Sequence, residues 1–241
     1  MDLGFIGTGT IAAAVVVGIA DDDHRIMVSE RNTAQSSRLA ERFGTVTMAT
    51  NQAVVDGSEV VFLGLLAGHA PEVLTDLKFR AGQRVISFIA EIALEDIATM
   101  VAPAEAVAIM LPFPAIAKGG SPILTLGDAT LVREIFAPAN AVFALQSPAE
   151  LNAYLCAQAV LSPALLLVAS AADWMNNQGV DRAAGEAFLR ALVGSSLQAG
   201  DCRQTLTALS TPGGYNLRLR QAMEHSGMET ALTKGLDDLK G

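Results

Sequence analysis

Two glycines and an alanine lie in an expected strand-to-helix turn at the start of this chain. Residues 3–6 are apolar and predict a buried strand, and the uncharged stretch that begins at Thr10 predicts a helix. Gly7, Gly9 and Ala12 have the spacing of a turn that binds the diphosphate of a dinucleotide. Gly7 permits a tight turn, Gly9 lets the diphosphate approach the backbone, and the free amides of the helix attract it. The alternative is a tight turn that binds nothing.

A serine and an arginine lie at the end of the second expected strand, residues 25–29. Ser29 is the last residue of this strand, and Arg31 follows two positions later. An acid about 20 residues beyond the glycines favours the unphosphorylated cofactor, because it holds the ribose hydroxyls. Here Arg31 can instead pair with a 2′-phosphate and Ser29 can donate to it, provided that Glu30 points away. The alternative is that Glu30 and Arg31 are ordinary surface charges at a helix start.

Composition predicts a globular protein of one or two domains. The chain has 241 residues, of which 51% are hydrophobic and 17% charged, so disorder is not expected. A net charge of −9 without a basic run argues against a nucleic-acid partner. Cys156 and Cys202 are too few and too far apart for a disulfide framework or a metal site, which favours a reducing compartment. No secretion signal is expected, because the N-terminus already reads as a strand.

One uncharged segment, residues 151–172, is long enough to cross a bilayer. It contains several polar residues and a proline, Pro163, which favours a helix buried in a core or a dimer interface. A membrane span is the less favoured alternative.

Strand and helix patterns alternate through the first part of the chain. Such alternation predicts a parallel sheet that is covered on both faces, with ligands at the carboxyl ends of its strands. Those ends are expected to place Gly7, Ser29, Leu65, Ile89 and Met110 around one crevice. The expected strands after the first are residues 25–29, 46–48, 60–65, 85–89 and 106–110, and the expected helices after the first are residues 33–43, a short one from Asn51, one that ends at Lys78, and residues 93–101.

The alternation stops near Pro148, and nearly all that follows has a helical pattern. We therefore predict a dinucleotide-binding domain over residues 1–148 and a helical domain for substrate binding and dimerisation over residues 149–241. Its expected helices are residues 150–178, residues 181–198 with Asp181 as N-cap, and residues 217–239 with a break around Gly227.

Four segments of the chain resemble the pyrroline-5-carboxylate reductase family. The resemblance covers nearly the whole chain, and the segments are residues 4–9 (GFIGTG), 28–31 (VSER), 110–115 (MLPFPA) and 210–214 (STPGG). The last is the most specific, because it looks like the turn that binds the substrate in that family. A helix start with two glycines is also a sensible carboxylate site on physical grounds, although a plain helix-start turn is the alternative.

The resemblance implies an α/β protein with an N-terminal Rossmann-type, mostly parallel sheet and an all-helical C-terminal dimerisation domain. Members of the family reduce a cyclic imine that carries a carboxylate with hydride from NADPH or NADH. They are dimers in which the crevice of one subunit meets the substrate turn of its partner. The implied cofactor-binding residues are Gly7, Thr8, Gly9, Thr10, Ile11, Ser29, Arg31, Asn51, Leu65 and Leu66, and the implied substrate-binding residues are Pro212, Gly213, Gly214, Tyr215 and Asn216.

Departures from the family pattern cluster where the substrate is expected to bind. Tyr215 and Asn216 replace two threonines, Pro112 replaces an asparagine, Leu66 and Ala67 replace Lys-Pro, and residues 160–164 (VLSPA) replace Gly-Ser-Gly-Pro-Ala. The Ala-Ala-Gly turn of the family is likewise replaced, by residues 89–91 (IAE). The cofactor half of the pattern is kept better than the substrate half.

The sequence therefore predicts a cytoplasmic, NADPH-dependent reductase (NADH being the alternative cofactor) that acts on a small cyclic imine, most simply pyrroline-5-carboxylate. A reductase of another imino or keto acid and a nucleotide-binding sensor without turnover are the alternatives. An iminium substrate is already protonated, so no strong general acid is required. Tyr215, His69 and Glu91 are weak candidates for a proton donor. We expect a homodimer or a dimer-based oligomer, with no nucleic acid, membrane or metal involved.

Overall fold

The computed structural model describes residues 1–240 of the chain, which form two compact units. The first unit is Met1–Leu151 and the second begins at Asn152. The sequence placed the division slightly earlier, at Pro148, where α7 (Pro148–Ala157) begins.

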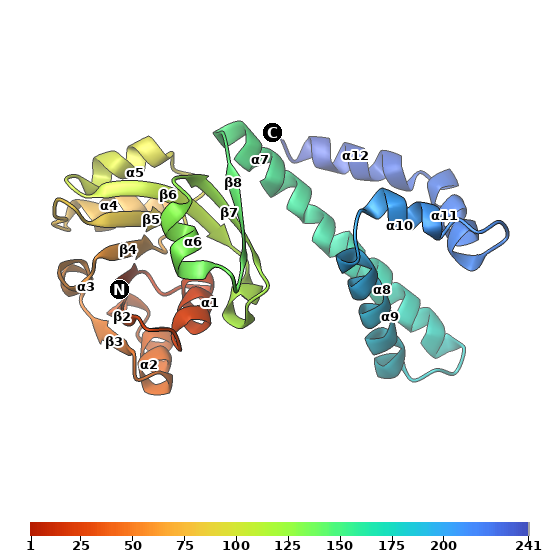
Figure 1. The fold of residues 1–241 in the computed structure, drawn as a ribbon, viewed down its shortest axis with the longest axis horizontal. Coiled ribbons are helices and arrows are strands. Elements are labelled where there is room, and N and C mark those ends of the chain that lie inside the picture. Colours follow the sequence, from red (N-terminus) through yellow and green to blue (C-terminus); the bar gives the residue numbers. More distant parts are fainter. Residues whose placement is uncertain (241) are drawn as a thin grey trace. The chain divides into compact units, whose positions relative to one another are not determined.

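An eight-stranded sheet forms the centre of the N-terminal unit (Figure 1), in the order β3-β2-β1-β4-β5-β6-β7-β8. The neighbouring strands β3, β2, β1, β4, β5 and β6 all run parallel. β7 is antiparallel to β6, and β8 is parallel to β7. The mostly parallel sheet that the sequence predicted is therefore confirmed. The strand bounds are β1 Asp2–Ile6, β2 Arg25–Ser29, β3 Val46–Ala49, β4 Val60–Leu63, β5 Arg84–Ser87, β6 Glu105–Pro112, β7 Pro122–Gly127 and β8 Ala141–Leu145.

Helices connect the parallel strands and cover both faces of the sheet. Thr50 caps α3 by accepting a hydrogen bond from the Ala53 amide, and Asn32 caps α2 in the same way through the Gln35 amide. Two expected helix ends were too late: the helix expected to reach Lys78 ends at Thr75, and the one expected to reach Phe43 ends at Arg42. The bounds are α1 Thr10–Ile19, α2 Thr33–Arg42, α3 Asn51–Gly57, α4 Ala70–Thr75, α5 Leu94–Val101 and α6 Thr130–Phe136, with short 3₁₀ turns η1 Glu30–Asn32, η2 Ala67–His69 and η3 Pro114–Lys118.

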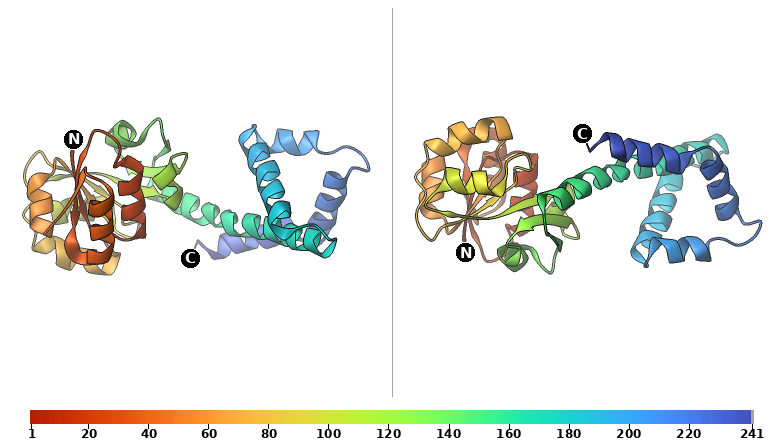
Figure 2. Two further views of the ribbon diagram at one scale, coloured as in Figure 1. Left: turned by 90° about the horizontal axis from the view of Figure 1, so that it is seen from below. Right: turned by 90° about the horizontal axis from the view of Figure 1, so that it is seen from above.

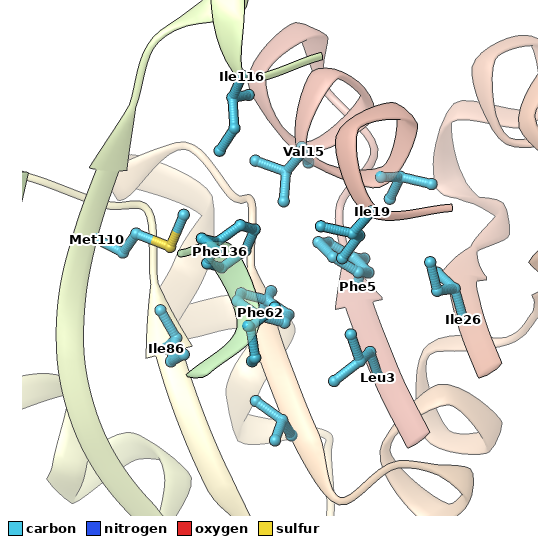
Figure 3. Packing of buried hydrophobic residues seen from close by; sticks show 14 of the residues in the cluster. Leu3, Phe5, Val15, Ile19, Ile26, Phe62, Ile86, Met110, Ile116 and Phe136 are labelled. Atoms are coloured by element: carbon cyan, nitrogen blue, oxygen red, sulfur yellow. The ribbon is translucent and has the colours of Figure 1, made fainter. Parts of the chain in front are cut away.

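Two hydrophobic cores, one on each face, hold the sheet. The first packs α1, α2, α6 and η3 onto the strands, and the second packs α3, α4 and α5. Figure 3 shows Val15 and Ile116 of the first core directed toward the aromatic rings on the central strands. There Phe5 stacks on Phe62 with ring centroids 4.6 Å apart, and Phe136 meets Phe62 edge-on at 6.1 Å. Each such side chain contributes about 1.5–3 kcal/mol by leaving water, so this unit contains its own source of stability.

The C-terminal unit consists of helices (Figure 2). The Asp181 side chain accepts a hydrogen bond from the Ala184 amide at 2.9 Å, which confirms it as the N-cap of α9. Gly227, in the left-handed region with φ +87°, produces the predicted break between α11 and α12. The sequence did not predict α10. The bounds are η4 Gln158–Val160, α8 Leu161–Asn177, α9 Arg182–Gln198, α10 Cys202–Ala208, α11 Tyr215–His225 and α12 Met228–Asp238.

Large apolar side chains of these helices lie exposed. Leu166 of α8 is 65% exposed and Phe188 of α9 is 58% exposed. An apolar groove of about 560 Å³ runs between α8 and α12, lined by side chains that include Pro163, Leu167 and Leu232. The helical run Pro148–Asn177, which comprises α7, η4 and α8, is long and apolar enough to cross a membrane, and 11% of its most apolar window is buried.

Candidate functional site

The glycine turn lies at the position where the strand order of the sheet reverses. β1 pairs with β2 on one side and with β4 on the other, so the chain leaves β1 between the two halves of the parallel sheet. Crevices at such a switch point, outside the carboxyl ends of the strands, are the usual ligand sites of open α/β sheets. The same edge carries the segments that follow β2, β4 and β5, as predicted from the alternation. The expectation for Met110 was wrong, because β6 continues to Pro112 and Met110 is fully buried in the core.

Gly7 and Gly9 have the freedom that a diphosphate site needs. Gly7 has φ +89°, and a Cβ there would lie 2.5 Å from the carbonyl oxygen of Gly64. A Cβ on Gly9 would meet nothing within 4 Å, so this glycine leaves open space in front of the backbone. The carbonyl of Gly9 accepts the first bond of α1, from the Ala13 amide at 2.9 Å. The amides of residues 10–12 have no partner within the helix and are free for an anion, so the turn fits a dinucleotide diphosphate.

Three buried hydroxyls lie behind this turn. Thr8 is 1% exposed, while Ser29 and Ser36 are 0% exposed. The Ser29 Oγ accepts a hydrogen bond from the Gly7 amide at 2.8 Å, and the Ser36 Oγ lies 2.7 Å from the Thr8 Oγ1. The Ser36 hydroxyl also donates to the Ser29 carbonyl oxygen at 2.7 Å. The glycine turn is thereby fixed to the end of β2 and to the body of α2.

This arrangement corrects the expected contact of Ser29 and restricts that of Thr8. Ser29 has no exposed surface with which to touch a 2′-phosphate, because its side chain is occupied by the Gly7 amide. The Thr8 side chain likewise faces the protein interior, so a contact of Thr8 with a ligand is left to its backbone.

Two residues of this cluster, Asn32 and Ser36, were missed from the sequence. The Asn32 Nδ2 donates to the Thr8 carbonyl oxygen at 3.1 Å while its Oδ1 caps α2. An asparagine before a helix is a recognisable cap signal, so Asn32 could have been found. Ser36 sits inside a helix, where a serine gives no comparable signal, and only the packing of α2 reveals it.

The segment after β2 presents the candidate phosphate-reading side chains. Arg31 and Glu30 of η1 are exposed, and Asn51 is half-buried at the start of α3, directly after β3. A hollow of about 330 Å³ opens between the first turns of α1 and α2. Its polar lining comes from Thr8, Thr10, Asn32 and Gln35, and its apolar lining from Ala13, Ala14 and Val17 of α1.

The other crevice loops carry mostly exposed residues. Leu65 is half-buried and Leu66 is 74% exposed after β4, while His69 and Glu91 are exposed. A cavity of about 470 Å³ adjoins the loop after β5, and its lining combines apolar residues such as Ala90, Ile109 and Leu126 with the polar Glu95 and Gln146. His69 and Glu91 are the weak candidates for a proton donor in this unit. Among the described residues, neither side chain has a hydrogen-bond partner that would orient it.

The predicted substrate turn, residues 210–214, belongs to the C-terminal unit. Gly213 has φ +76°, and the Gly214 amide donates to the Thr211 carbonyl oxygen at 2.9 Å, which closes the turn before α11. Gly214 caps α11 without a side-chain hydrogen bond. Arg220 donates to the Ser210 Oγ at 2.9 Å and to the Leu206 carbonyl oxygen at 3.1 Å, and thus ties the turn to α10.

Both substituted residues that follow the turn point to solvent. Tyr215 is 89% exposed and Asn216 is exposed as well. The turn therefore presents free amides at the start of α11 with a phenol beside them.

Comparison with known proteins agrees with this architecture. Residues 2–91 match the family described as NADP oxidoreductase coenzyme F420-dependent. A search of curated proteins finds no match. Among solved structures, 1-pyrroline-5-carboxylate reductase from Streptococcus pyogenes is 22% identical with a TM-score of 0.81, over 100% of this chain and 98% of that one.

Two further structures are similar over the same extent. Pyrroline-5-carboxylate reductase from Coxiella burnetii is 17% identical with a TM-score of 0.84, over 99% of this chain and 95% of that one. Pyrroline carboxylate reductase from Plasmodium falciparum, solved with NADP bound, is 14% identical with a TM-score of 0.81, over 100% and 95%. The resemblance seen in the four sequence segments is thus confirmed for the fold of the whole chain.

Proposed function

We propose that this chain is an NADPH-dependent reductase of a small cyclic imine, most simply of pyrroline-5-carboxylate to proline. The observation that carries the proposal is the glycine turn at the switch point, which leaves Gly9 open and the amides of residues 10–12 free. The likeness of the whole chain to structures of pyrroline-5-carboxylate reductases supports it.

NADPH is the proposed cofactor because the cation Arg31 follows β2, and the neighbouring Glu30 is exposed. The exposed guanidinium of Arg31 can pair with the 2′-phosphate in a fork geometry. The adjoining hollow offers the phosphate polar groups from Thr10, Asn32 and Gln35. NADP bound in the Plasmodium falciparum enzyme supports the same choice. Asn51, Leu65, Leu66 and Ile11 are proposed to line the remainder of the dinucleotide, since they lie on the loops and helix start at the same sheet edge.

The substrate carboxylate is proposed to bind the turn that opens α11. Gly213 and Gly214 leave the amides at the helix start accessible, and the dipole of α11 favours an anion there. Pro212 fixes the approach to the turn, and Tyr215 and Asn216 stand where they can contact the rest of the substrate. An exposed tyrosine at this position favours a substrate with more apolar surface than a bare imino acid.

Hydride supplied by the bound dinucleotide would reduce the C=N carbon of the imine. The chain itself has to hold the diphosphate, orient the substrate and exclude water. A protonated iminium needs no strong acid at the nitrogen, which suits the exposed and unoriented His69 and Glu91. Tyr215 is the candidate donor for a neutral imine, because it follows the proposed carboxylate site directly.

A second copy of the chain is the proposed partner of the helical unit. The exposed leucines of α8 and α9 and the apolar groove beside α12 form a surface too apolar for a free monomer. A homodimer that covers this surface would also bury the apolar side chains of the long helical run Pro148–Asn177, so no membrane is needed to explain them. Cys156 and Cys202 are both free cysteines, which is consistent with the proposed cytoplasmic location.

Two other functions are favoured by particular observations. The cavity beside Ala90 and the replacements Pro112 and Tyr215 favour a reductase of another imino or keto acid. The replacements Pro112, Tyr215 and Asn216 in the substrate half also favour a sensor that binds the dinucleotide without turnover.

The test is NADPH oxidation, followed by absorbance, with purified protein and pyrroline-5-carboxylate. We expect turnover that requires both compounds. NADPH binding by fluorescence without turnover would overturn the proposed substrate, and the variant Tyr215→Thr, Asn216→Thr would then distinguish the alternatives. Activity gained in this variant indicates a reductase with a changed substrate. NADPH binding without NADPH oxidation by either protein, on a panel of imino and keto acids, indicates the sensor.

A further inference from the structure

Ser36 belongs to no expected cofactor contact, yet it lies at the centre of the buried hydroxyls behind the glycine turn. We propose that the Thr8–Ser36 hydrogen bond is a latch that holds the glycine turn at a fixed position relative to Arg31. Ser36 is then a positioning residue that tunes the affinity for NADPH, and more so than the affinity for NADH. The inference rests on the proposed use of NADPH.

The direction of the hydrogen bonds in the latch follows from proton counting. A serine or threonine hydroxyl carries one proton, and a carbonyl oxygen can only accept. The Ser36 hydroxyl donates its proton to the Ser29 carbonyl oxygen at 2.7 Å. The proton in the 2.7 Å contact between Thr8 Oγ1 and Ser36 Oγ therefore comes from Thr8. The chain of donors runs from Thr8 through Ser36 to the end of β2.

The latch is buried from water, and its hydroxyls have few alternative hydrogen-bond partners. Ser36 is 0% exposed and Thr8 is 1% exposed, so water cannot replace a lost partner without a change in packing. The other acceptor within reach of Thr8 Oγ1 is the Ser29 carbonyl oxygen, at a long 3.4 Å. Removal of the Ser36 hydroxyl thus leaves the Thr8 hydroxyl with an acceptor at a distance that gives only a weak hydrogen bond.

The latch is placed where both phosphate sites depend on it. Thr8 stands between Gly7 and Gly9 in the diphosphate turn, and Ser36 stands in the helix that Arg31 precedes. Polar bonds flank Arg31 on both sides, since the Asn32 side chain donates to the Thr8 carbonyl oxygen and the Gly7 amide donates to the Ser29 Oγ. A ligand that binds both the glycine turn and Arg31 gains affinity when the separation of these two segments is fixed before it binds. NADPH, with its 2′-phosphate, is such a ligand, whereas NADH lacks the second charge.

The experiment compares dissociation constants for NADPH and NADH, measured by fluorescence on the full-length protein. For Ser36→Ala we expect the Kd for NADPH to rise about 3- to 10-fold, the size expected for one hydrogen bond, and the Kd for NADH to rise less. Ser37→Ala is the matched control: it lies on the same helix, and within residues 1–240 the side-chain hydrogen bond of Ser37 is a long one to the Met48 sulfur at 4.0 Å. Neither constant should change in this control.

A second pair of variants separates positioning from simple loss of stability. Thr8→Val removes the hydroxyl at nearly constant volume, and Thr8→Ser keeps it. We expect Thr8→Val to weaken NADPH binding, whereas Thr8→Ser should retain the affinity of the wild type. The double variant Thr8→Val, Ser36→Ala leaves no orphaned hydroxyl at the pair, so it should recover stability in urea unfolding but not NADPH affinity.

Each outcome decides the inference. Ser36→Ala and Thr8→Val proteins that remain folded and bind NADPH as the wild type does would overturn it, and so would equal losses for NADPH and NADH. A Ser36→Ala protein that fails to fold leaves the decision to the Thr8 pair. A wild-type chain that binds neither dinucleotide would overturn this inference together with the proposed function, whereas a wild type that binds NADPH confines the failure to the latch.

Discussion

The two units of this chain bury their apolar residues to very different extents. In the N-terminal unit, Phe5, Phe62 and Ile86 are 0% exposed, and both faces of the sheet have a core. In the C-terminal unit, the described apolar side chains that are buried are Cys156 and Ala172, while Leu166 and Trp174 are 65% and 64% exposed. Both units contain well-formed helices, so the difference lies in what covers those helices.

The difference teaches where each unit obtains its stability. The strands of the first unit are covered from both sides by helices of the same chain, so burial is complete without a partner. A helix that is apolar on most sides needs a cover on most sides, and a hairpin such as α8 and α9 supplies only one. The dinucleotide site is therefore expected to form in a single chain, and the helical unit to depend on a second copy.

The largest effect is expected from a cavity in the first core. Phe62→Ala should lower the free energy of unfolding by about 3–5 kcal/mol, because Phe62 is fully buried between Phe5 and Phe136. Urea unfolding followed by circular dichroism measures this loss. Phe143→Ala is the control, since Phe143 is 44% exposed on β8 and should cost less than half as much. Similar losses for the two variants would contradict a self-sufficient core.

A charge on the helical unit should break the dimer rather than the fold. In a single chain Leu166→Glu costs little, because the side chain is 65% exposed, but in a dimer it buries an unpaired carboxylate. We expect the dimer dissociation constant to rise at least about tenfold, as one uncompensated buried polar group costs 1–3 kcal/mol or more. Light scattering across a dilution series measures the mass.

The N-terminal unit provides the control for this prediction. Phe143→Glu introduces the same charge at an exposed aromatic residue of β8 and should leave the mass unchanged. NADPH binding should be retained in Leu166→Glu if the two units differ as described. A wild-type protein that is monomeric at micromolar concentration would contradict the comparison itself.

The parallel sheet could be predicted because its strands leave strong local signals. Each of β1, β2, β4 and β5 is a short apolar run followed by a loop and a helix, and the expected bounds agree with the structure to within about two residues. β7 and β8 were missed for different reasons. β7 begins with Pro122 and ends with Gly127, which are typical of loops. β8 reads AVFAL, which is a continuous apolar run, so its strand signal was present in the sequence and was overlooked. The helix α10 has seven residues and no apolar periodicity, which is too short for a reliable signal.

The site divides in the same way between local and distant causes. Gly7 and Gly9 could be predicted, because their roles follow from backbone conformation in one turn. The burial of Ser29 could not, since it depends on how β2 lies beside the Gly7 amide, which is distant in sequence. Ser36 depends on the rotation of α2 about its axis, which no local pattern of polar residues specifies.

A smaller effect is expected at the proposed reader of the 2′-phosphate. Arg31→Ala should raise the Kd for NADPH by about 10- to 100-fold, the value of a charged hydrogen bond of 1.5–3 kcal/mol, and leave NADH nearly unchanged. Arg31→Lys should fall between, because an ammonium cannot form the two-pronged contact. Fluorescence titration of both dinucleotides measures the ratio. Glu30→Gln is the control for net charge, and a loss of the same size there would contradict a specific role for Arg31.

The smallest predicted effect compares one helix cap in each unit. Thr50→Ala and Asp181→Ala each remove a side chain that accepts a hydrogen bond from a first-turn amide, at 3.3 Å from Ala53 and 2.9 Å from Ala184. Either loss should cost about 1 kcal/mol. The cost of Thr50→Ala should be the same at every protein concentration, because α3 packs within its own unit. The cost of Asp181→Ala should appear in a transition that moves with concentration, if α9 is stabilised by the proposed second copy. Asp181→Asn keeps an acceptor oxygen and should therefore retain most of the stability that Asp181→Ala loses. Unfolding of Thr50→Ala and Asp181→Ala that is independent of protein concentration would show that the helical unit is stabilised within one chain.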